Sequence, residues 1–92
     1  MKVEYDPAKN TKNIADRDLP FNLVKLADWD TALVSEDTRN DYPERRYVAM
    51  ACINYRLHVT CFTPIEGGIR VISLRKANKR EVLNYEKQYP PC

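Results

Sequence analysis

The chain has 92 residues, 43% of them hydrophobic, and its 15 Lys and Arg against 13 Asp and Glu give a net charge of +2 at pH 7. This length supports one domain, spanning residues 1–92, with an adequate but small core. No apolar stretch approaches the roughly 20 residues that cross a bilayer. The first nine residues, MKVEYDPAK, lack the apolar region of a signal peptide. These features exclude a membrane-spanning protein and give no sign of secretion.

The charge is distributed unevenly along the chain. Residues 1–44 carry 6 cationic and 10 acidic side chains, whereas residues 69–92 carry 6 cationic and 2 acidic ones. The positive second half could steer a polyanion to one face of the protein, although ordinary solvated charge is the simpler alternative. Its densest part, IRVISLRKANKREVLNYE at residues 69–86, is typical of a strand, a basic turn and a capped helix.

The first half of the chain contains clear helix and strand signals. Alternating apolar and charged side chains at residues 2–5 predict a short strand. Asp6 and Pro7 start a helix, because a side-chain cap is followed by a proline at the first helical position, and this helix runs to about residue 16 or 17. The elements expected next are a short helix opened by Pro20 over residues 21–27, a strand at residues 31–35 and a polar loop at residues 36–44.

The second half predicts a sheet that ends in a helix. Strands at residues 45–53 and 56–63 are joined by Asn54-Tyr55, which is short enough for a hairpin. A last strand is expected at residues 69–74. Asn78 then caps a helix, with Glu81 as its capping-box partner. The order of elements predicts an α+β fold: a mostly antiparallel sheet, two N-terminal helices and a C-terminal helix, all helices on one side of the sheet.

Metal and cofactor chemistry is not expected. Cys52, Cys61 and Cys92 are an odd number of cysteines without metal-ligand spacing. Cys52 and Cys61 fall within expected strands and read as buried free thiols, so a reducing cytoplasm fits best. His58, the single histidine, lies within a strand without a cluster of carboxylates or cysteines, which favours a structural role. Gly67-Gly68 is typical of a turn and not of a nucleotide-binding loop.

Arginines carry the remaining chemistry. If the last strand alternates regularly, Arg70 shares a face with Leu74, whereas Ser73 and Arg75 point to the opposite face. A guanidinium group in an apolar strand needs a partner or a groove. Several guanidinium groups around one phosphate would stabilise the charge that develops during phosphoryl transfer, and the same arrangement would also hold an acidic partner.

Two further arginines begin the strand at residues 45–53. Arg45 and Arg46 point to opposite faces, so one of them could join the arginines of the last strand across the sheet. The alternative for each arginine is a structural ion pair, such as Arg46 with Glu36 or Asp37.

A series of short segments in a fixed order extends over nearly the whole chain. The segments are Asp6-Pro7-Ala8-Lys9, Asn13, Phe21, Glu36-Asp37-Thr38-Arg39, Asp41-Tyr42, Arg46-Tyr47-Val48-Ala49, Phe62-Thr63, Ile69-Arg70-Val71-Ile72-Ser73, Arg75-Lys76-Ala77, Arg80-Glu81 and Tyr85-Glu86. On these residues the chain resembles the BrnT family, the ribonuclease toxins of type II toxin–antitoxin pairs.

The resemblance implies a RelE-like fold and an endoribonuclease that uses no metal, inhibits translation and is neutralised by a BrnA-like antitoxin. The implied partners are RNA and the antitoxin, in a hetero-oligomer that reaches operator DNA only through the antitoxin. The implied location is the cytoplasm. The residues implied for catalysis are Arg46, Arg70, Arg75, Arg80 and Glu81, and those implied for RNA binding are Arg45, Lys76, Lys79 and Tyr85.

Two positions depart from the family pattern. The family usually has Lys-His-Gly after the first helix, where this chain has Asp16-Arg17-Asp18, and it often has His where this chain has Asn40. If either histidine serves as an acid or a base, this protein would cut RNA slowly or not at all. The alternative function is therefore a weak or inactive homologue that binds an antitoxin in operon autoregulation. An interaction protein unrelated to RNA is a third hypothesis.

Overall fold

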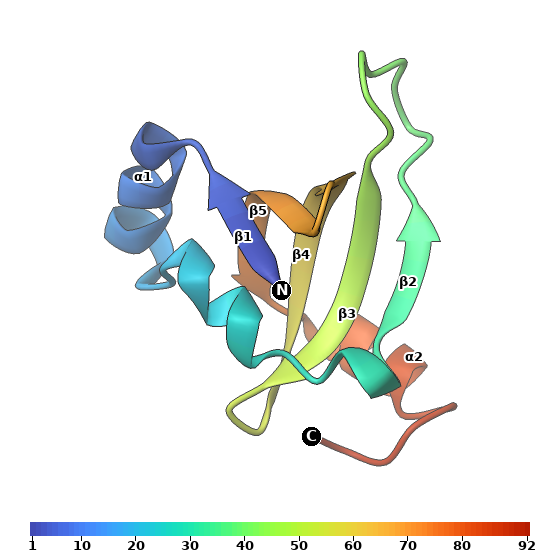
Figure 1. The fold of residues 1–92 in the computed structure, drawn as a ribbon. Helices are drawn as coiled ribbons and strands as arrows, with labels where there is room; N and C mark the ends of the chain where they lie inside the picture. The colour runs from blue at the N-terminus through green and yellow to red at the C-terminus, as the bar shows by residue number, and fades with distance from the viewer.

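The protein is built on a five-stranded mixed sheet with the strand order β1-β5-β4-β3-β2 (Figure 1). The computed structural model describes all 92 residues. β1 runs parallel to β5, and every other neighbouring pair is antiparallel, as predicted for most of the sheet. The elements are β1 (Lys2–Tyr5), α1 (Pro7–Arg17), the 3-10 segments η1 (Phe21–Leu26) and η2 (Trp29–Thr31), β2 (Leu33–Glu36), β3 (Tyr47–Ile53), β4 (Arg56–Ile65), β5 (Gly68–Lys76) and α2 (Lys79–Tyr85).

The N-terminal helical segments cover one face of the sheet (Figure 1). Asp6 caps α1 as predicted, because its side chain accepts a hydrogen bond from the Ala8 amide at 2.9 Å. The buried Asn13 amide donates to the carbonyl oxygens of Leu19 at 2.8 Å and Leu74 at 3.0 Å, which ties α1 to β5. The larger core cluster lies under these segments and consists of Leu19, Phe21, Val24, Ala49, Ile53, Phe62, Ile69, Val71 and Leu74.

The C-terminal helix covers part of the opposite face. Asn78 and Glu81 form the predicted capping box, with both reciprocal hydrogen bonds at 2.9 Å. Beneath α2 lies a second cluster of buried residues, which consists of Leu57, Val59, Ala77 and Tyr85. Helices therefore lie on both faces, and the prediction of a single helical side was wrong. The reason is that β4 buries side chains on both of its faces, and each face needs a cover.

Local signals predicted most elements but not all of their conformations. The second predicted helix forms as the 3-10 segment η1, and the 3-10 segment η2 that follows it was not predicted. The turn Asn54-Tyr55 closes the β3–β4 hairpin as predicted, with positive φ angles of 49° and 64° that match a type I′ turn. None of the helices is long and apolar enough to cross a membrane.

The cysteines differ from the prediction. Cys52 forms a disulfide with Cys92, 40 residues later in the chain, and only Cys61 is free. The segment after α2 folds back towards β3 (Figure 1), and this return brings Cys92 to the strand. The single histidine, His58, is buried. Its Nδ1 lies 2.8 Å from the Arg56 carbonyl oxygen, which fits a structural role.

Candidate functional site

The part of the sheet that α2 leaves uncovered forms the floor of a groove of about 400 Å³. Floor residues come from three neighbouring strands in register: Val48 lies opposite Cys61, and Cys61 lies opposite Ser73. One wall is the first turn of α2, with Glu81. The other wall is the start of the loop between β2 and β3, with Arg39.

A β-bulge in β5 determines which arginines reach this face. The pairing of β5 with β4 shifts by one residue and leaves Ile72 without a partner. Leu74 is therefore buried in the same core cluster as Val71, on the face covered by α1. Arg70 consequently shares its face with Arg75. The regular alternation assumed from the sequence had placed these two arginines on opposite faces, so that prediction was wrong.

Arg75 is fixed at the groove by Glu81. Its Nη1 donates to Glu81 Oε1 at 2.8 Å and its Nη2 donates to Oε2 at 2.9 Å. Because the Asn78 amide also donates to this carboxylate, the helix cap and the arginine fork share one acceptor group. The hydrogen bonds between the pair raise the pKa of Arg75 and lower the pKa of Glu81. Glu81 is therefore a weak base, and its contribution is to orient Arg75.

The β2–β3 loop supplies a second carboxylate, Asp37, which is buried. The Asp37 side chain is 1% exposed and accepts hydrogen bonds from Arg39 Nε and Nη2, both at 2.9 Å, and from the Tyr42 hydroxyl at 3.2 Å. The hydrogen bonds from Arg39 hold the pKa of Asp37 well below its ordinary value. The Arg39 side chain stays 76% exposed. The sequence predicts only a polar loop here, although the Asp37–Arg39 spacing within a turn was an available signal.

Arg46 joins this loop to β3. Its Nε donates to Glu44 at 3.2 Å, and its guanidinium carbon lies 4.1 Å from the centre of the Tyr42 ring. The backbone carbonyl of Arg46 accepts a hydrogen bond from the Asp37 amide at 2.8 Å, which closes the base of the loop. Arg46 therefore forms an ion pair with Glu44. The sequence had suggested Glu36 or Asp37 as its partner.

Arg70 lies further along the same face. It donates to Glu4 of β1 at 3.2 Å, and the Arg70 side chain is 58% exposed, whereas that of Glu4 is 36% exposed. The four arginines on this face of the sheet and its loop are Arg39, Arg46, Arg70 and Arg75. We call them the groove arginines. Each is paired with a carboxylate.

The other residues predicted for the site lie outside the groove. Lys76 pairs with His58 in the sheet and points to the opposite face from its neighbour Arg75. The Tyr85 ring is 1% exposed and its hydroxyl donates to the Thr31 carbonyl at 2.9 Å, so it cannot stack on a base unless the core opens.

Three further predicted residues are exposed: Lys79 and Arg80 of α2, and Arg45 in the loop before β3. Lys79 and Arg80 line a separate surface groove over Met50 and Leu83, on the outer side of α2. Arg45 is exposed and, unlike Arg46, forms no ion pair. The proposed site therefore separates into a central arginine groove and a flanking cationic helix.

The chemistry that the groove offers is electrostatic. Asp37 and Glu81 are held ionised by their arginine partners, so neither donates a proton near neutral pH. Burial raises the pKa of the Cys61 thiol in the floor, which keeps it neutral. No group of three or more His, Cys, Asp and Glu side chains is placed to hold a metal ion. The groove presents oriented guanidinium donors, which suit an oxyanion such as a phosphate.

Fold and groove together define a small α+β protein with an arginine-rich surface on its sheet. Residues 5–81 match the family model of BrnT, the ribonuclease toxin of type II toxin–antitoxin systems. The chain belongs to this family. A search of curated proteins finds no match to the chain.

Proposed function

We propose that this protein is an endoribonuclease toxin that cuts RNA without a metal ion and thereby inhibits translation in the cytoplasm. The observation that carries the proposal is that the groove arginines lie on one face of the sheet and its loop, where Arg39 and Arg75 line the groove itself. A single-stranded RNA laid along this face would meet guanidinium donors from β5, which carries Arg70 and Arg75, and from the β2–β3 loop, which carries Arg39 and Arg46.

The proposed reaction is attack of a ribose 2′-hydroxyl on the adjacent phosphorus. The 2′-hydroxyl proton passes to water, the 5′-oxygen of the next nucleotide leaves and takes a proton from water, and a 2′,3′-cyclic phosphate forms. Arg75 and Arg46 stabilise the extra negative charge on the phosphate oxygens, and Arg70 holds a neighbouring phosphate. Glu81 acts as a positioning residue because it fixes the Arg75 fork.

The proposed partner is a BrnA-like antitoxin. Type II toxins are held by a protein antitoxin, and the family therefore implies such a partner. An antitoxin that covers the groove would carry acidic groups to the groove arginines and to Arg80 on α2. The complex would be a hetero-oligomer that contacts operator DNA only through the antitoxin.

The test is cleavage of single-stranded RNA by purified wild type, R75Q and R46Q. Loss of one donor to the transferring phosphate is expected to lower the cleavage rate by about 10²–10³-fold. R75K should lie between R75Q and wild type, because lysine keeps the charge but not the fork. K25A is the control, since Lys25 lies on η1 at the covered face. Unchanged cleavage in folded R75Q and R46Q would remove these residues from the reaction.

A second function is supported by the ion pairs themselves. Every groove arginine already has a carboxylate partner, and His58 is buried away from the groove. A catalytically weak toxin homologue that serves as an antitoxin-binding module in operon autoregulation would need only this surface. Growth on induction separates the two functions. An active toxin arrests growth, and R70A or R75A relieves the arrest, whereas a binding module leaves growth unchanged in all three.

A further inference from the structure

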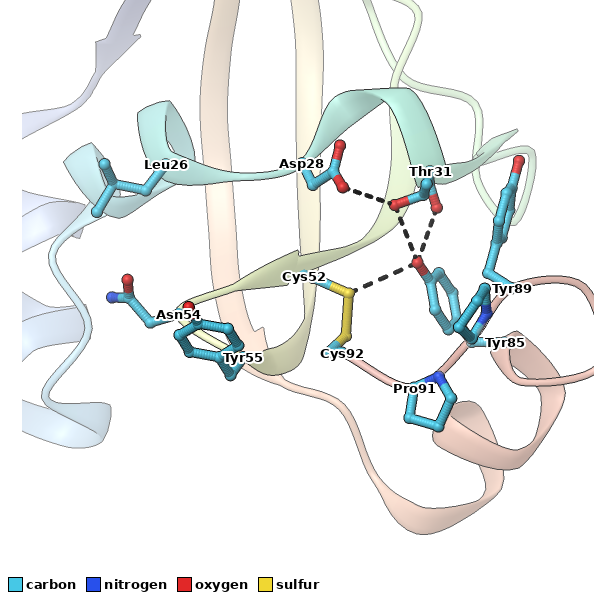
Figure 2. Close-up of a pocket in the computed structure, with 11 residues that line it drawn as sticks. Leu26, Asp28, Thr31, Cys52, Asn54, Tyr55, Tyr85, Tyr89, Pro91 and Cys92 are labelled. Atoms are coloured by element: carbon cyan, nitrogen blue, oxygen red, sulfur yellow. Dashed lines mark hydrogen bonds between the residues drawn. A yellow bond between two sulfur atoms is a disulfide. The ribbon is translucent and has the colours of Figure 1, made fainter.

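The segment after α2 is attached to the end of β3 by the disulfide between Cys52 and Cys92 (Figure 2). Cys52 lies in β3 and Cys92 is 40 residues further on. The BrnT match ends at residue 81, so the segment and its cysteine lie outside the part of the chain that matches the family model.

The disulfide lies on the wall of an open cleft. Both cysteines are only partly buried, and both line a cleft of about 490 Å³ between the C-terminal segment, the β3–β4 turn and the segment before β2. Figure 2 shows the disulfide in this cleft, with Tyr55 of the turn at the rim. Tyr55 is 92% exposed, so it does not seal the entrance. The cleft therefore leaves the disulfide open to approach by a small thiol.

The same disulfide supports the packing of α2. The Tyr85 hydroxyl lies 3.5 Å from Cys52 Sγ and donates to the Thr31 carbonyl at 2.9 Å. The Tyr89 ring packs on Tyr85 with centroids 5.4 Å apart. α2 has seven residues, too few to be stable without packing, so these contacts hold the helix in place.

The first turn of α2 reaches the groove. It carries Glu81, whose carboxylate orients Arg75 through two hydrogen bonds. Loss of order in α2 would release this fork, and Arg75 would lose its fixed position on the groove floor. Closure of the disulfide at one end of α2 is thereby linked to the arrangement of the arginine at the other end.

We propose that Cys52 and Cys92 form a thiol–disulfide exchange site for low-molecular-weight thiols and disulfides of the glutathione type. Closure of the disulfide orders α2 and strengthens RNA binding in the groove. The effect on RNA binding rests on the proposed function, whereas the exchange site does not. In a reducing compartment a disulfide is transient and responds to the redox state, so the protein would bind RNA most tightly under oxidising conditions.

The exchange proceeds in two steps. The Cys92 thiolate attacks one sulfur of glutathione disulfide, and a glutathione thiolate leaves. The Cys52 thiolate then attacks the Cys92 sulfur of the mixed disulfide, which forms the Cys52–Cys92 bond and releases the second glutathione thiolate. Two protons pass from the cysteines to the glutathione thiolates. The protein pair is oxidised by two electrons, and the external disulfide is reduced to two thiols.

The first experiment measures exchange and order without RNA. The full chain is equilibrated in glutathione buffers of different thiol-to-disulfide ratio, alkylated and analysed by mass spectrometry. Two cysteines are expected to change together, with Cys61 alkylated throughout. Hydrogen exchange in α2 should be faster in the reduced protein. C61S should retain both responses, and C92S should resemble the reduced protein at every ratio.

The second experiment measures the affinity for a labelled single-stranded RNA in both redox states. Reduction is expected to weaken binding by about fivefold or more, the lower range of typical allosteric coupling. Three free thiols at every ratio would overturn the exchange site. A disulfide that forms without any change in α2 exchange or RNA affinity would overturn the coupling. If α2 responds and neither state binds RNA, the proposed function fails and the exchange site stands.

Discussion

At the scale of single residues, the groove is organised by carboxylates that hold arginines in position. Arg75 and Arg39 each present a planar fork to one buried or half-buried carboxylate. An arginine fixed in this way loses less side-chain entropy when a phosphate arrives than a free one would. The carboxylate also neutralises part of the arginine's charge. Each pair therefore orients its guanidinium group well but binds a phosphate less strongly than a free arginine would.

The Asp37 pair makes a prediction about pH. The folded state lowers the pKa of Asp37 below its ordinary value of 3.8, so ionised Asp37 stabilises the fold above that pH and this stabilisation is lost as the pH falls below it. D37N should therefore be less stable than wild type at pH 7, and the difference should shrink towards pH 2. Urea unfolding across this range is the measurement. The exposed Asp41 has no ion pair, and D41N should keep the wild-type profile.

At the scale of elements, β1 depends on a close approach at the start of β5. A Cβ atom added to Gly68 would clash with the backbone of Lys2, to which it is paired. G68A should displace β1 and lower the free energy of unfolding by about 1–3 kcal/mol. Denaturant unfolding and hydrogen exchange of residues 2–5 would measure this.

The neighbouring glycine provides a matched comparison. Gly67 has a φ of 78° and open space around its Cβ position, so G67A is strained only in its backbone. It should lower the free energy of unfolding by roughly 1 kcal/mol and leave the exchange of β1 unchanged. Equal exchange of β1 in the two variants would mean that the close approach does not govern the pairing.

Elements with local signals were predictable, and those set by distant contacts were not. Asp6 capped its helix and Asn54-Tyr55 made its turn, because each signal acts on the residues beside it. The bulge at Ile72 depends on how β5 packs against both layers, so regular alternation misplaced Arg70. The return of Cys92 to β3 likewise has no local signal.

The candidate site divided in the same way. Three of the groove arginines were visible in the sequence: Arg46, which precedes β3, and Arg70 and Arg75 of β5. Arg39 was missed because its importance comes from Asp37, whose burial is a tertiary property. Tyr85 was selected for binding, although it belongs to the apolar face of α2 and is buried.

At the scale of the whole molecule, the groove arginines should govern how RNA binding depends on salt. Each phosphate that a cation neutralises in single-stranded RNA contributes about 0.7 to the slope of log affinity against log salt concentration. R39Q and R46Q should each lower the slope by about this amount, and K25A should leave it unchanged. Anisotropy titrations at several salt concentrations test the prediction. A slope that is equal in all four proteins would mean that RNA phosphates lie elsewhere.

The parallel pairing of β1 with β5 has a consequence for synthesis. The first strand of the chain can only enter the sheet after the last strand has been made, so the sheet closes when residues 68–76 become available. Such long-range pairing slows folding relative to local contacts. Arg75 and the helix that orients it belong to this late segment. A nascent chain still missing that segment would therefore have no assembled groove.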